Sequence, residues 1–260
     1  KPQNPVFEVK DGSVIFENVS FAYSQKSDVS VLNNINLEIK SGETVGIIGA
    51  TGSGKTSLVS LIPRLYDATV GTVKVGGVDV KQYNMDTLRN KVAMVLQKNV
   101  LFSGTVAENL RWGDETATEE DLRSAARQAC AEEFIDALPG GFDYDLGQGG
   151  VNVSGGQKQR LCIARAMLKK PDVIIFDDST SAVDTKTDAQ IRAALREYAP
   201  ETTKIIIAQR ISSVEDADKI VVMDEGGISG IGTHEQLLKT NGIYREVYES
   251  QIKGGEADEA

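Results

Sequence analysis

The chain has 260 residues, 40% of them hydrophobic, and its 28 basic against 38 acidic side chains give a formal net charge of −10. This acidic balance argues against a nucleic-acid partner, which usually leaves a basic surface on a protein. The two cysteines, Cys130 and Cys162, are too few for a disulfide framework and suit a reducing, cytosolic compartment. No run approaches the ~20 apolar residues of a membrane-spanning helix, so we expect any membrane role to come from a partner or from another segment.

The amino-terminal part of the chain predicts strands of two kinds and one helix. Alternating apolar and polar residues over 14–39 indicate an antiparallel layer. The short apolar run 44–48 indicates a buried strand, and the helix that follows is bent or ended by Pro63. The apolar face of this helix is expected to contain Leu58, Leu61, Ile62 and Leu65.

Further along, strands alternate with helices. The glycine pair at 76–77 marks a hairpin, and 92–96 is expected to be a strand. Over 99–169 the pattern is helical, with a capping box opening one helix at Thr118 and a long helix beginning after Ser154. This order predicts a mainly parallel sheet covered by helices on both faces. The later elements are a strand over 173–176, a helix over 184–198 and strands over 204–208 and 220–223.

The segment between the buried strand and the first helix, Gly49 to Thr56, matches the pattern G-x-x-x-x-G-K-[ST] in full. Glycines let the backbone curl until several N–H groups point at one phosphate, and the helix start adds a partial positive charge. Lys55 can reach the β- and γ-phosphates of a nucleotide, and the Thr56 hydroxyl can ligate Mg²⁺. A glycine-rich turn without a ligand is the alternative. The predicted nucleotide contacts are Gly49, Thr51, Gly52, Ser53, Gly54, Lys55, Thr56 and Ser57.

A second strand carries acidic residues at its end, because Asp177 and Asp178 follow the apolar run 173–176. In nucleotidases that have this type of phosphate loop, a carboxylate at a strand end holds Mg²⁺. An apolar strand with an acidic end indicates little by itself. Together with the loop at 49–56 it predicts that Asp177 is a metal ligand.

The third motif, Ser154-Gly155-Gly156-Gln157, lies at the start of the long helix. A helix amino terminus with a serine and two glycines is suited to hold a phosphate, and a capped helix with a glycine-rich lead-in is the alternative. The motif resembles the signature of ATP-binding cassette (ABC) proteins, in which leucine is commoner than Val153 at the preceding position. In that family two domains dimerise head to tail. The resemblance implies that these four residues contact the ATP held by the partner's phosphate loop.

The resemblance covers nearly the whole chain and implies its fold class. An ABC nucleotide-binding domain over 1–253 would have a P-loop NTPase (RecA-like) α/β core with a parallel sheet, and an antiparallel β subdomain. This core would be formed by 1–98 and 170–253, with an inserted helical subdomain over 99–169. The acidic tail over 254–260 is expected to be flexible.

Other segments match the family one by one. Tyr23 corresponds to the aromatic residue that stacks on adenine, and a buried structural tyrosine is the alternative. Gln97 looks like the glutamine that touches Mg²⁺ and links the subdomains, and the segment 181–184 resembles the loop that crosses to the partner's site. The stretch 101–109 is similar to that of exporters. It implies a transmembrane domain on the same polypeptide and a place at the cytoplasmic face of the membrane.

Two departures from the family pattern concern hydrolysis. The family usually has glutamate, which polarises the attacking water, where this chain has Asp178, and histidine where it has Gln209. The only histidine, His234, is expected to be structural or at the surface. Gln97, Asp178 and Gln209 are the candidate catalytic residues. Both departures together resemble the degenerate-site half of a bacterial heterodimeric multidrug exporter, in which one ATP site hydrolyses poorly and the other turns over.

Three functions compete at this stage. The first is the ATPase domain of an exporter that uses Mg-ATP and pairs with a second nucleotide-binding domain. The second is a regulatory nucleotide-binding module without useful turnover, which the residues at 178 and 209 also favour. The third is a DNA-repair or chromosome-organising ATPase with the same motifs. Such proteins usually carry very long coiled coils, whereas 98–153 has room only for a compact helical subdomain, and we expect no nucleic-acid partner.

Overall fold

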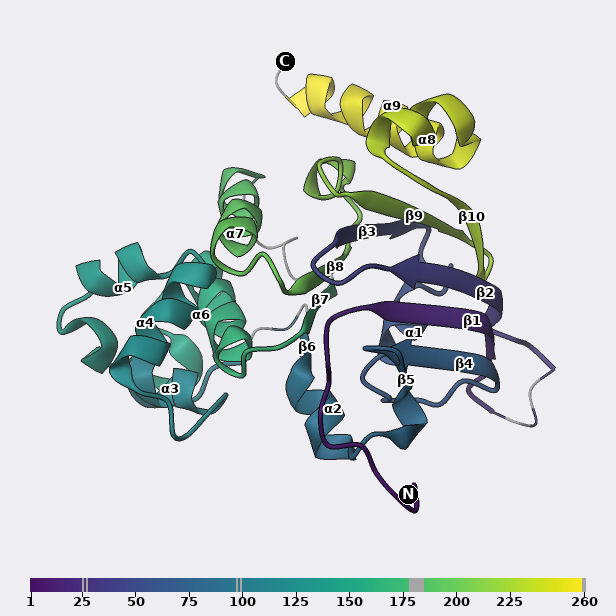
Figure 1. Ribbon diagram of the computed structural model, residues 1–260. Coiled ribbons are helices and arrows are strands. Elements are labelled where there is room, and N and C mark those ends of the chain that lie inside the picture. Colours follow the sequence, from purple (N-terminus) through teal and green to yellow (C-terminus); the bar gives the residue numbers. More distant parts are fainter. Residues whose placement is uncertain (25, 27, 97, 99, 178–184, 259–260) are drawn as a thin grey trace. The chain divides into compact units, whose positions relative to one another are not determined.

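The structure is a computed structural model of the 260-residue chain, and it describes residues 1–24, 26, 28–96, 98, 100–177 and 185–258. The chain divides into two compact units (Figure 1). The first is built from residues 1–89 and 203–260, and the second from 90–202. The first unit therefore consists of both ends of the chain, and the second is one continuous insertion.

The first unit contains an antiparallel sheet with the strand order β2-β1-β4-β5. Its strands alternate between buried apolar and exposed polar residues, as expected for a sheet with one face on the core. The hairpin between β4 and β5 turns at Gly76 and Gly77, both with positive φ, which suits the primed turns that join twisted strands. The predicted layer and hairpin are confirmed. The strands are β1 (Val14–Phe21), β2 (Leu32–Ile39), β4 (Val70–Val75) and β5 (Val78–Asp79).

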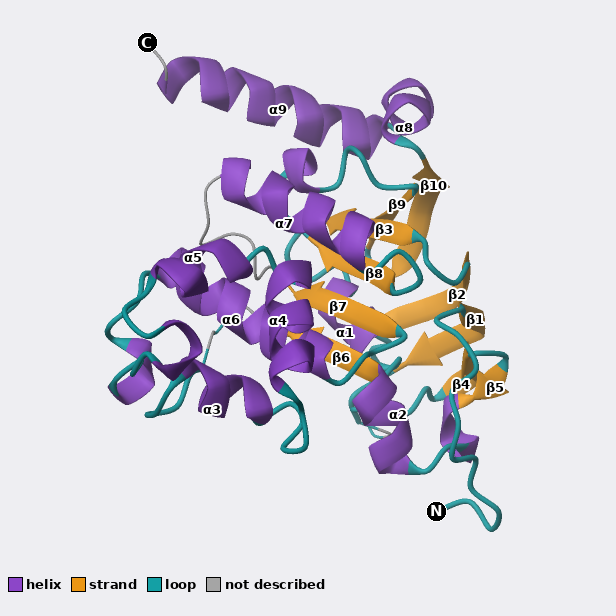
Figure 2. Ribbon diagram, turned by 60° about the vertical axis from the view of Figure 1, so that its left-hand side comes forward, coloured by secondary structure: helices purple, strands orange, loops and turns teal. Residues whose placement is uncertain are grey.

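A second set of strands in this unit surrounds β3 (Thr44–Gly49). β3 pairs in parallel with β8 (Thr203–Ile207) on one side and with β9 (Lys219–Asp224) on the other. β10 (Gly227–Gly232), which the sequence did not predict, pairs antiparallel with β9. Figure 2 shows β9, β3 and β8 side by side. Because both edges of β3 are occupied, its first five residues are buried, and its carboxyl end has a fixed position.

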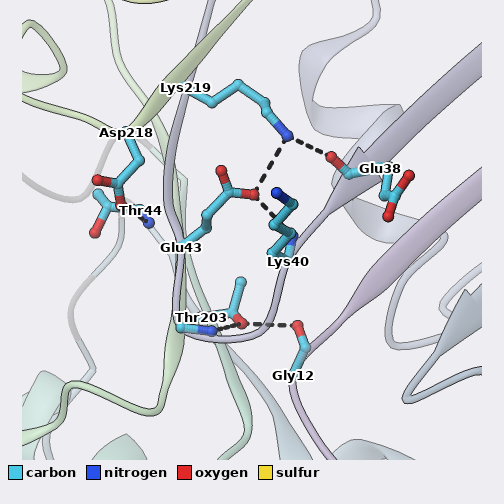
Figure 3. A network of polar contacts seen from close by, with 9 residues as sticks. Gly12, Glu38, Lys40, Glu43, Thr44, Thr203, Asp218 and Lys219 are labelled. Carbon is cyan, nitrogen blue, oxygen red and sulfur yellow. Dashed lines mark hydrogen bonds and ion pairs between the residues drawn. The ribbon is translucent and has the colours of Figure 1, made fainter.

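A network of polar contacts fixes the amino end of β3 (Figure 3). The carboxylate of Glu43 accepts hydrogen bonds from the backbone of Lys40 (2.8 Å) and from Lys219 Nζ (3.3 Å). Lys219 Nζ also donates to the carbonyl oxygen of Glu38 at 2.5 Å. The turn between β2 and β3 is thus attached to the first residue of β9.

Thr203, the first residue of β8, makes a second set of contacts at this end (Figure 3). Its hydroxyl donates to the carbonyl oxygen of Gly12 (2.7 Å) and accepts from the backbone N–H of Gly42 (3.0 Å). Thr203 is fully buried. These bonds join β8 to the turn before β3 and to the segment that leads into β1, so the three strands begin from one shared anchor.

The helices of the first unit differ from expectation in two places. α1 (Lys55–Ser60) ends before Pro63, so Leu65 lies beyond the helix and is 50% exposed instead of buried. α9 (Gly242–Asp258) continues into the segment predicted as a flexible tail. The remaining elements are η1 (Val80–Gln82), α2 (Met85–Lys91, at the boundary with the second unit), η4 (Ile211–Ser213) and α8 (His234–Thr240).

His234 has a structural role at the start of α8. Its Nδ1 lies 2.6 Å from the hydroxyl of Tyr244, a fully buried residue of α9. Burial raises the pKa of the Tyr244 hydroxyl, which therefore stays neutral. The pair joins α8 to α9, in agreement with the expectation that His234 lies outside the catalytic centre.

The second unit combines a two-stranded parallel pair with helices. β6 (Val92–Val95) pairs in parallel with β7 (Val173–Asp177). α6 packs against α3 and α4, and its residues Leu161, Ile163 and Ala164 are fully buried. The other elements are α3 (Val106–Arg111), α4 (Glu119–Gln128), α5 (Glu132–Ala137), η2 (Gly141–Asp143), η3 (Gln148–Gly150), α6 (Gly155–Leu168) and α7 (Thr185–Tyr198).

Two sequence predictions about this unit are confirmed. A capping box opens α4 at Thr118, and the long helix α6 begins after Ser154, where the structure adds a second capping box that the sequence did not predict. The α/β fold class, with a parallel sheet, an antiparallel sheet and a helical insertion, is also confirmed. Among the helices that the structure describes, none has the length and apolar character needed to cross a membrane.

Candidate functional site

The loop after β3 has a defined shape that its own backbone contacts maintain. Gly52 (φ +82°) and Gly54 (φ +102°) are in the left-handed region, which glycine adopts without strain. The N–H of Ser53 donates to the carbonyl oxygen of Ala50 (3.0 Å), and the carbonyl oxygen of Ser53 accepts from Gly226 N–H (3.0 Å). The turn between β9 and β10 therefore holds the loop from outside, a contact that the sequence did not predict.

The glycines of the loop serve different purposes. A Cβ at Gly49 would lie 2.5 Å from Ser53 Oγ, and one at Gly54 would lie 2.9 Å from Leu32 Cδ2, so both positions are too tight for a side chain. A Cβ at Gly52 would meet nothing within 4 Å among the described residues. The loop is thus closely packed at its two ends and open in the middle, as a cradle for a ligand requires.

The polar groups of the loop fit an anion. Ser53 is 4% exposed, and its hydroxyl has no hydrogen-bond partner within the part of the chain that the structure describes. Leaving a buried hydroxyl unpaired costs about 1–3 kcal/mol, which a phosphate oxygen would offset. Lys55 Nζ donates to the carbonyl oxygen of Gly49, and the Thr56 side chain at the start of α1 is exposed. These residues fit a nucleotide phosphate.

Tyr23 lies next to the helix that follows the loop. Its hydroxyl is 2.6 Å from Oγ of Ser57, which lies in the first turn of α1. The ring packs edge-on against Phe21 (4.8 Å between centroids) and Tyr66 (5.1 Å). Tyr23 is nevertheless 56% exposed, so the interpretation of a buried structural tyrosine is wrong. An exposed ring beside the phosphate loop meets the requirement for stacking on a nucleotide base.

Gln209 lies in the same unit as the loop. β3 and β8 run in parallel with Ile47 opposite Ile207, and the N–H of Ala208 donates to the carbonyl oxygen of Ile47 at 3.2 Å. Gln209 therefore leaves the sheet beside Gly49, where the loop begins. Ligands of open α/β sheets bind at such carboxyl ends of parallel strands. The side chain of Gln209 is exposed.

Of the other candidate residues, Asp177 belongs to the second unit, and several lie outside the residues that the structure describes. Asp177 is the last residue of β7 and is partly exposed, as a metal ligand at a strand end requires. Gln97, Asp178 and the segment 181–184 lie outside the described residues.

The motif at the start of α6 forms an exposed helix amino terminus. Ser154 Oγ accepts from the Gln157 N–H (3.2 Å), and Gln157 Oε1 accepts from the Ser154 N–H (3.0 Å). Ser154 and Gly155 are exposed, and a Cβ at Gly155 would meet nothing within 4 Å among the residues described. Gly156 follows in the first turn. Among the residues of its unit that the structure describes, none crowds Gly155, as a surface for a partner's ligand requires.

The fold and the site define a P-loop nucleotide-binding domain, and comparisons identify its family. The sequence model of the ABC transporter family matches residues 32–181, more than half of the chain. The chain therefore belongs to the ABC transporter family and is an ATP-binding domain of that family. The resemblance that the Ser154 motif indicated is confirmed.

Individual relatives agree with this assignment. The chain is 43% identical, over 94% of its length, to a putative multidrug export ATP-binding/permease protein of Staphylococcus aureus. It is 42% identical, over 93% of its length, to an uncharacterised ABC transporter ATP-binding protein of Bacillus subtilis. The chain spans 42% of the length of each of these two proteins.

A solved structure is also similar. The structure of a bacterial Atm1-family ABC exporter with ATP bound matches 96% of this chain, with a TM-score of 0.88 and 36% identity. The match covers 44% of the exporter chain. Both the curated relatives and the solved structure are thus more than twice as long as the segment that they share with this chain.

Proposed function

We propose that the chain binds Mg-ATP through Gly49 to Thr56 and couples ATP binding and hydrolysis to export by an ABC transporter. The observation that carries the proposal is the loop itself: among the described residues, nothing crowds Gly52, and the buried Ser53 hydroxyl has no hydrogen-bond partner. The similar exporter structure contains ATP, and the staphylococcal relative is named as a multidrug export protein.

Each part of the nucleotide has its own contacts in this proposal. The backbone of Gly49, Thr51, Gly52 and Gly54 surrounds the phosphates, Lys55 faces the β- and γ-phosphates, and the Tyr23 ring stacks on the base. In this proposal Thr56, Asp177 and Gln97 would be the ligands of Mg²⁺. The metal ion, when bound, neutralises negative charge on the phosphates.

The chain's own ATP site should hydrolyse slowly, because two groups near the γ-phosphate differ from the family pattern. Asp178 is one methylene shorter than the usual glutamate, so its carboxylate falls roughly 1 Å short. A misplacement of that size can cost about a hundredfold in rate. Gln209 can donate a hydrogen bond to the phosphate, but it lacks the positive charge that a histidine can carry.

The signature residues Ser154, Gly155, Gly156 and Gln157 contribute to a second site in this proposal. They would contact ATP held by a partner nucleotide-binding domain in a head-to-tail, heterodimeric arrangement. The exposed amino terminus of α6 supports this role. The transmembrane domain would be on the same polypeptide and would place the chain at the cytoplasmic face of the membrane, because the staphylococcal relative, named as an ATP-binding/permease protein, is more than twice as long.

The experiment that tests this division of roles measures ATP turnover by the assembled transporter. Ser154→Glu should reduce turnover roughly a hundredfold, because it places a negative charge where the partner's phosphates are held. Asp178→Ala should reduce it much less, because the site it damages is already slow. Equal losses from the two variants would contradict the proposal.

Thr118→Glu is the matched control for Ser154→Glu. Thr118 also opens a helix through a capping box, with Asp121, but it belongs to no predicted nucleotide contact. Both substitutions remove an N-cap worth about 1 kcal/mol of stability. A loss of turnover from Thr118→Glu as large as that from Ser154→Glu would show that capping, not phosphate contact, explains the effect.

A regulatory module without useful turnover is the second candidate, favoured by Asp178 and Gln209. Single-turnover hydrolysis of bound ATP separates the two, because a regulatory module would show none. The third candidate, a DNA-repair or chromosome-organising ATPase, is less well supported, because the described α-helices between residues 98 and 154 are only six to ten residues long.

A further inference from the structure

The side chain of Gln251, on α9, holds the segment that contains Gln209. Its Nε2 donates to the carbonyl oxygen of Gln209 (2.6 Å), and its Oε1 accepts from the N–H of Ile211 (2.9 Å). The orientation of the amide follows from the chemistry, because a carbonyl oxygen can only accept and a backbone N–H can only donate. One side chain thus binds the backbone on both sides of Arg210.

This segment also contacts β3. The backbone of Ala208 is bonded to Ile47, and a Cβ placed on Gly46 would lie 2.5 Å from Val214 Cβ, so the residues after β8 pack closely on β3. Ile211 is 1% exposed. Gln209 is exposed and lies between the buried residues Ala208 and Ile211, and α9 contacts η4, which begins at Ile211.

Gln251 restrains the backbone of this segment between residues 209 and 211. Backbone pairing holds the segment at Ala208, and burial of the side chain holds it at Ile211. Between these two points the Gln251 amide bonds to the backbone from α9. Its two bonds bridge the segment from residue 209 to residue 211, so they fix the backbone orientation from which the Gln209 side chain projects.

We infer that Gln251 is a positioning residue for the chain's own ATP site, where it holds the backbone of Gln209 so that the Gln209 amide reaches the γ-phosphate. The inference rests on the proposed function, because it requires that Gln209 act on bound ATP. It extends the functional unit to α9, a helix that contains no family motif and none of the predicted site residues.

The test compares Gln251→Ala with Glu249→Ala, which removes an exposed side chain from the same helix. Mg-ATP affinity is measured by calorimetry, and hydrolysis of bound ATP by single-turnover kinetics. Gln251→Ala should lower the hydrolysis rate about tenfold, as expected for the loss of one positioning contact. It should leave the affinity within about twofold, because the loop at 49–56 is intact. Glu249→Ala should change neither quantity.

Gln251→Glu tests which of the two bonds matters. The carboxylate keeps the length of the side chain and can still accept from Ile211 N–H, but it cannot donate to the Gln209 carbonyl oxygen. It should therefore lower the rate at least as much as alanine does. A rate equal to that of the unmodified chain would overturn the inference, because the bond to Gln209 would then be irrelevant.

A double variant separates positioning from general stability. If Gln251 acts through Gln209, then Gln251→Ala should cause no further loss of rate in a Gln209→Ala background. A further tenfold loss there would overturn the inference. If Gln209→Ala alone leaves the rate unchanged, the proposed role of Gln209 fails and the inference fails with it. If only Gln251→Ala is without effect, the proposed function stands and the inference alone fails.

Discussion

Removal of the buried hydroxyl of Ser53 should have opposite effects on two properties: it should stabilise the free chain and weaken nucleotide binding. Ser53→Ala removes a polar atom that finds no partner among the described residues of the free chain. Because an unpaired buried hydroxyl costs about 1–3 kcal/mol, its removal should raise the free energy of unfolding by about 1–2 kcal/mol, after the lost packing of one oxygen is deducted. A substitution in a binding loop would then stabilise the free chain.

The same substitution should weaken nucleotide binding. A hydroxyl that donates to a charged phosphate oxygen contributes about 1.5–3 kcal/mol, so the Kd for Mg-ATP should rise roughly ten- to a hundredfold. The assay is urea unfolding with and without Mg-ATP. At 100 times the native Kd, nucleotide should stabilise the unmodified chain by about 2.7 kcal/mol, and Ser53→Ala by no more than about 1.4 kcal/mol.

Ser60→Ala is the matched control. Ser60 is also a buried serine near the loop, at the end of α1, but its hydroxyl donates to the carbonyl oxygen of Thr56 at 2.7 Å. The substitution Ser60→Ala should therefore lower the free energy of unfolding by about 1 kcal/mol and leave the Kd for Mg-ATP unchanged. The reasoning is refuted if Ser53→Ala behaves like Ser60→Ala, with lower stability and an unchanged effect of nucleotide.

Three further predictions concern stacking on the nucleotide base, the rate of hydrolysis and the hydrogen bonds of Thr203. Tyr23→Ala should weaken ATP binding by about 1–3 kcal/mol and should not affect the binding of inorganic triphosphate, which calorimetry can compare. Asp178→Glu alone should raise the single-turnover rate only part of the way, and adding Gln209→His should raise it further, with non-additive effects; fast hydrolysis by the unmodified chain would contradict the degenerate-site proposal. Thr203→Val should lower the free energy of unfolding by about 2–3 kcal/mol, because the buried Gly12 carbonyl oxygen loses its donor. Thr203→Ser, which keeps the hydroxyl, should cost only about 1 kcal/mol in the same urea titration.

The sequence predicted the parts of the site that depend on local chemistry. The loop at 49–56 depends on glycines within the loop, and the capping box predicted at Thr118 joins residues three positions apart. Such features are fixed by neighbours in the chain, so one sequence contains the information. The antiparallel layer was predictable for the same reason, since its alternation repeats every two residues.

Features that depend on tertiary contacts were not predictable. Gly226 supports the phosphate loop and Gln251 the segment after β8, but each contact joins residues that are far apart in the sequence. β10 was missed because its glycines at 227, 230 and 232 disfavour strands, and pairing with β9 overrides that preference. The exposure of Leu65 also depends on where α1 ends, which helical periodicity alone does not fix.

The position of β3 between β8 and β9 has a consequence for how the chain folds during synthesis. β3 is synthesised before both of the strands that pair with it, and residues 50–202 lie between β3 and β8. At ~5–20 residues per second the wait is on the order of ten seconds or more. During this time the apolar run Val45, Ile47 and Ile48 has no partner strand, whereas residues 90–202 are continuous and can collapse by themselves. The loop at 49–56 should therefore be among the last parts of the chain to fold. Translation that stops before β9 should leave a nascent chain that is prone to aggregation and does not bind the nucleotide.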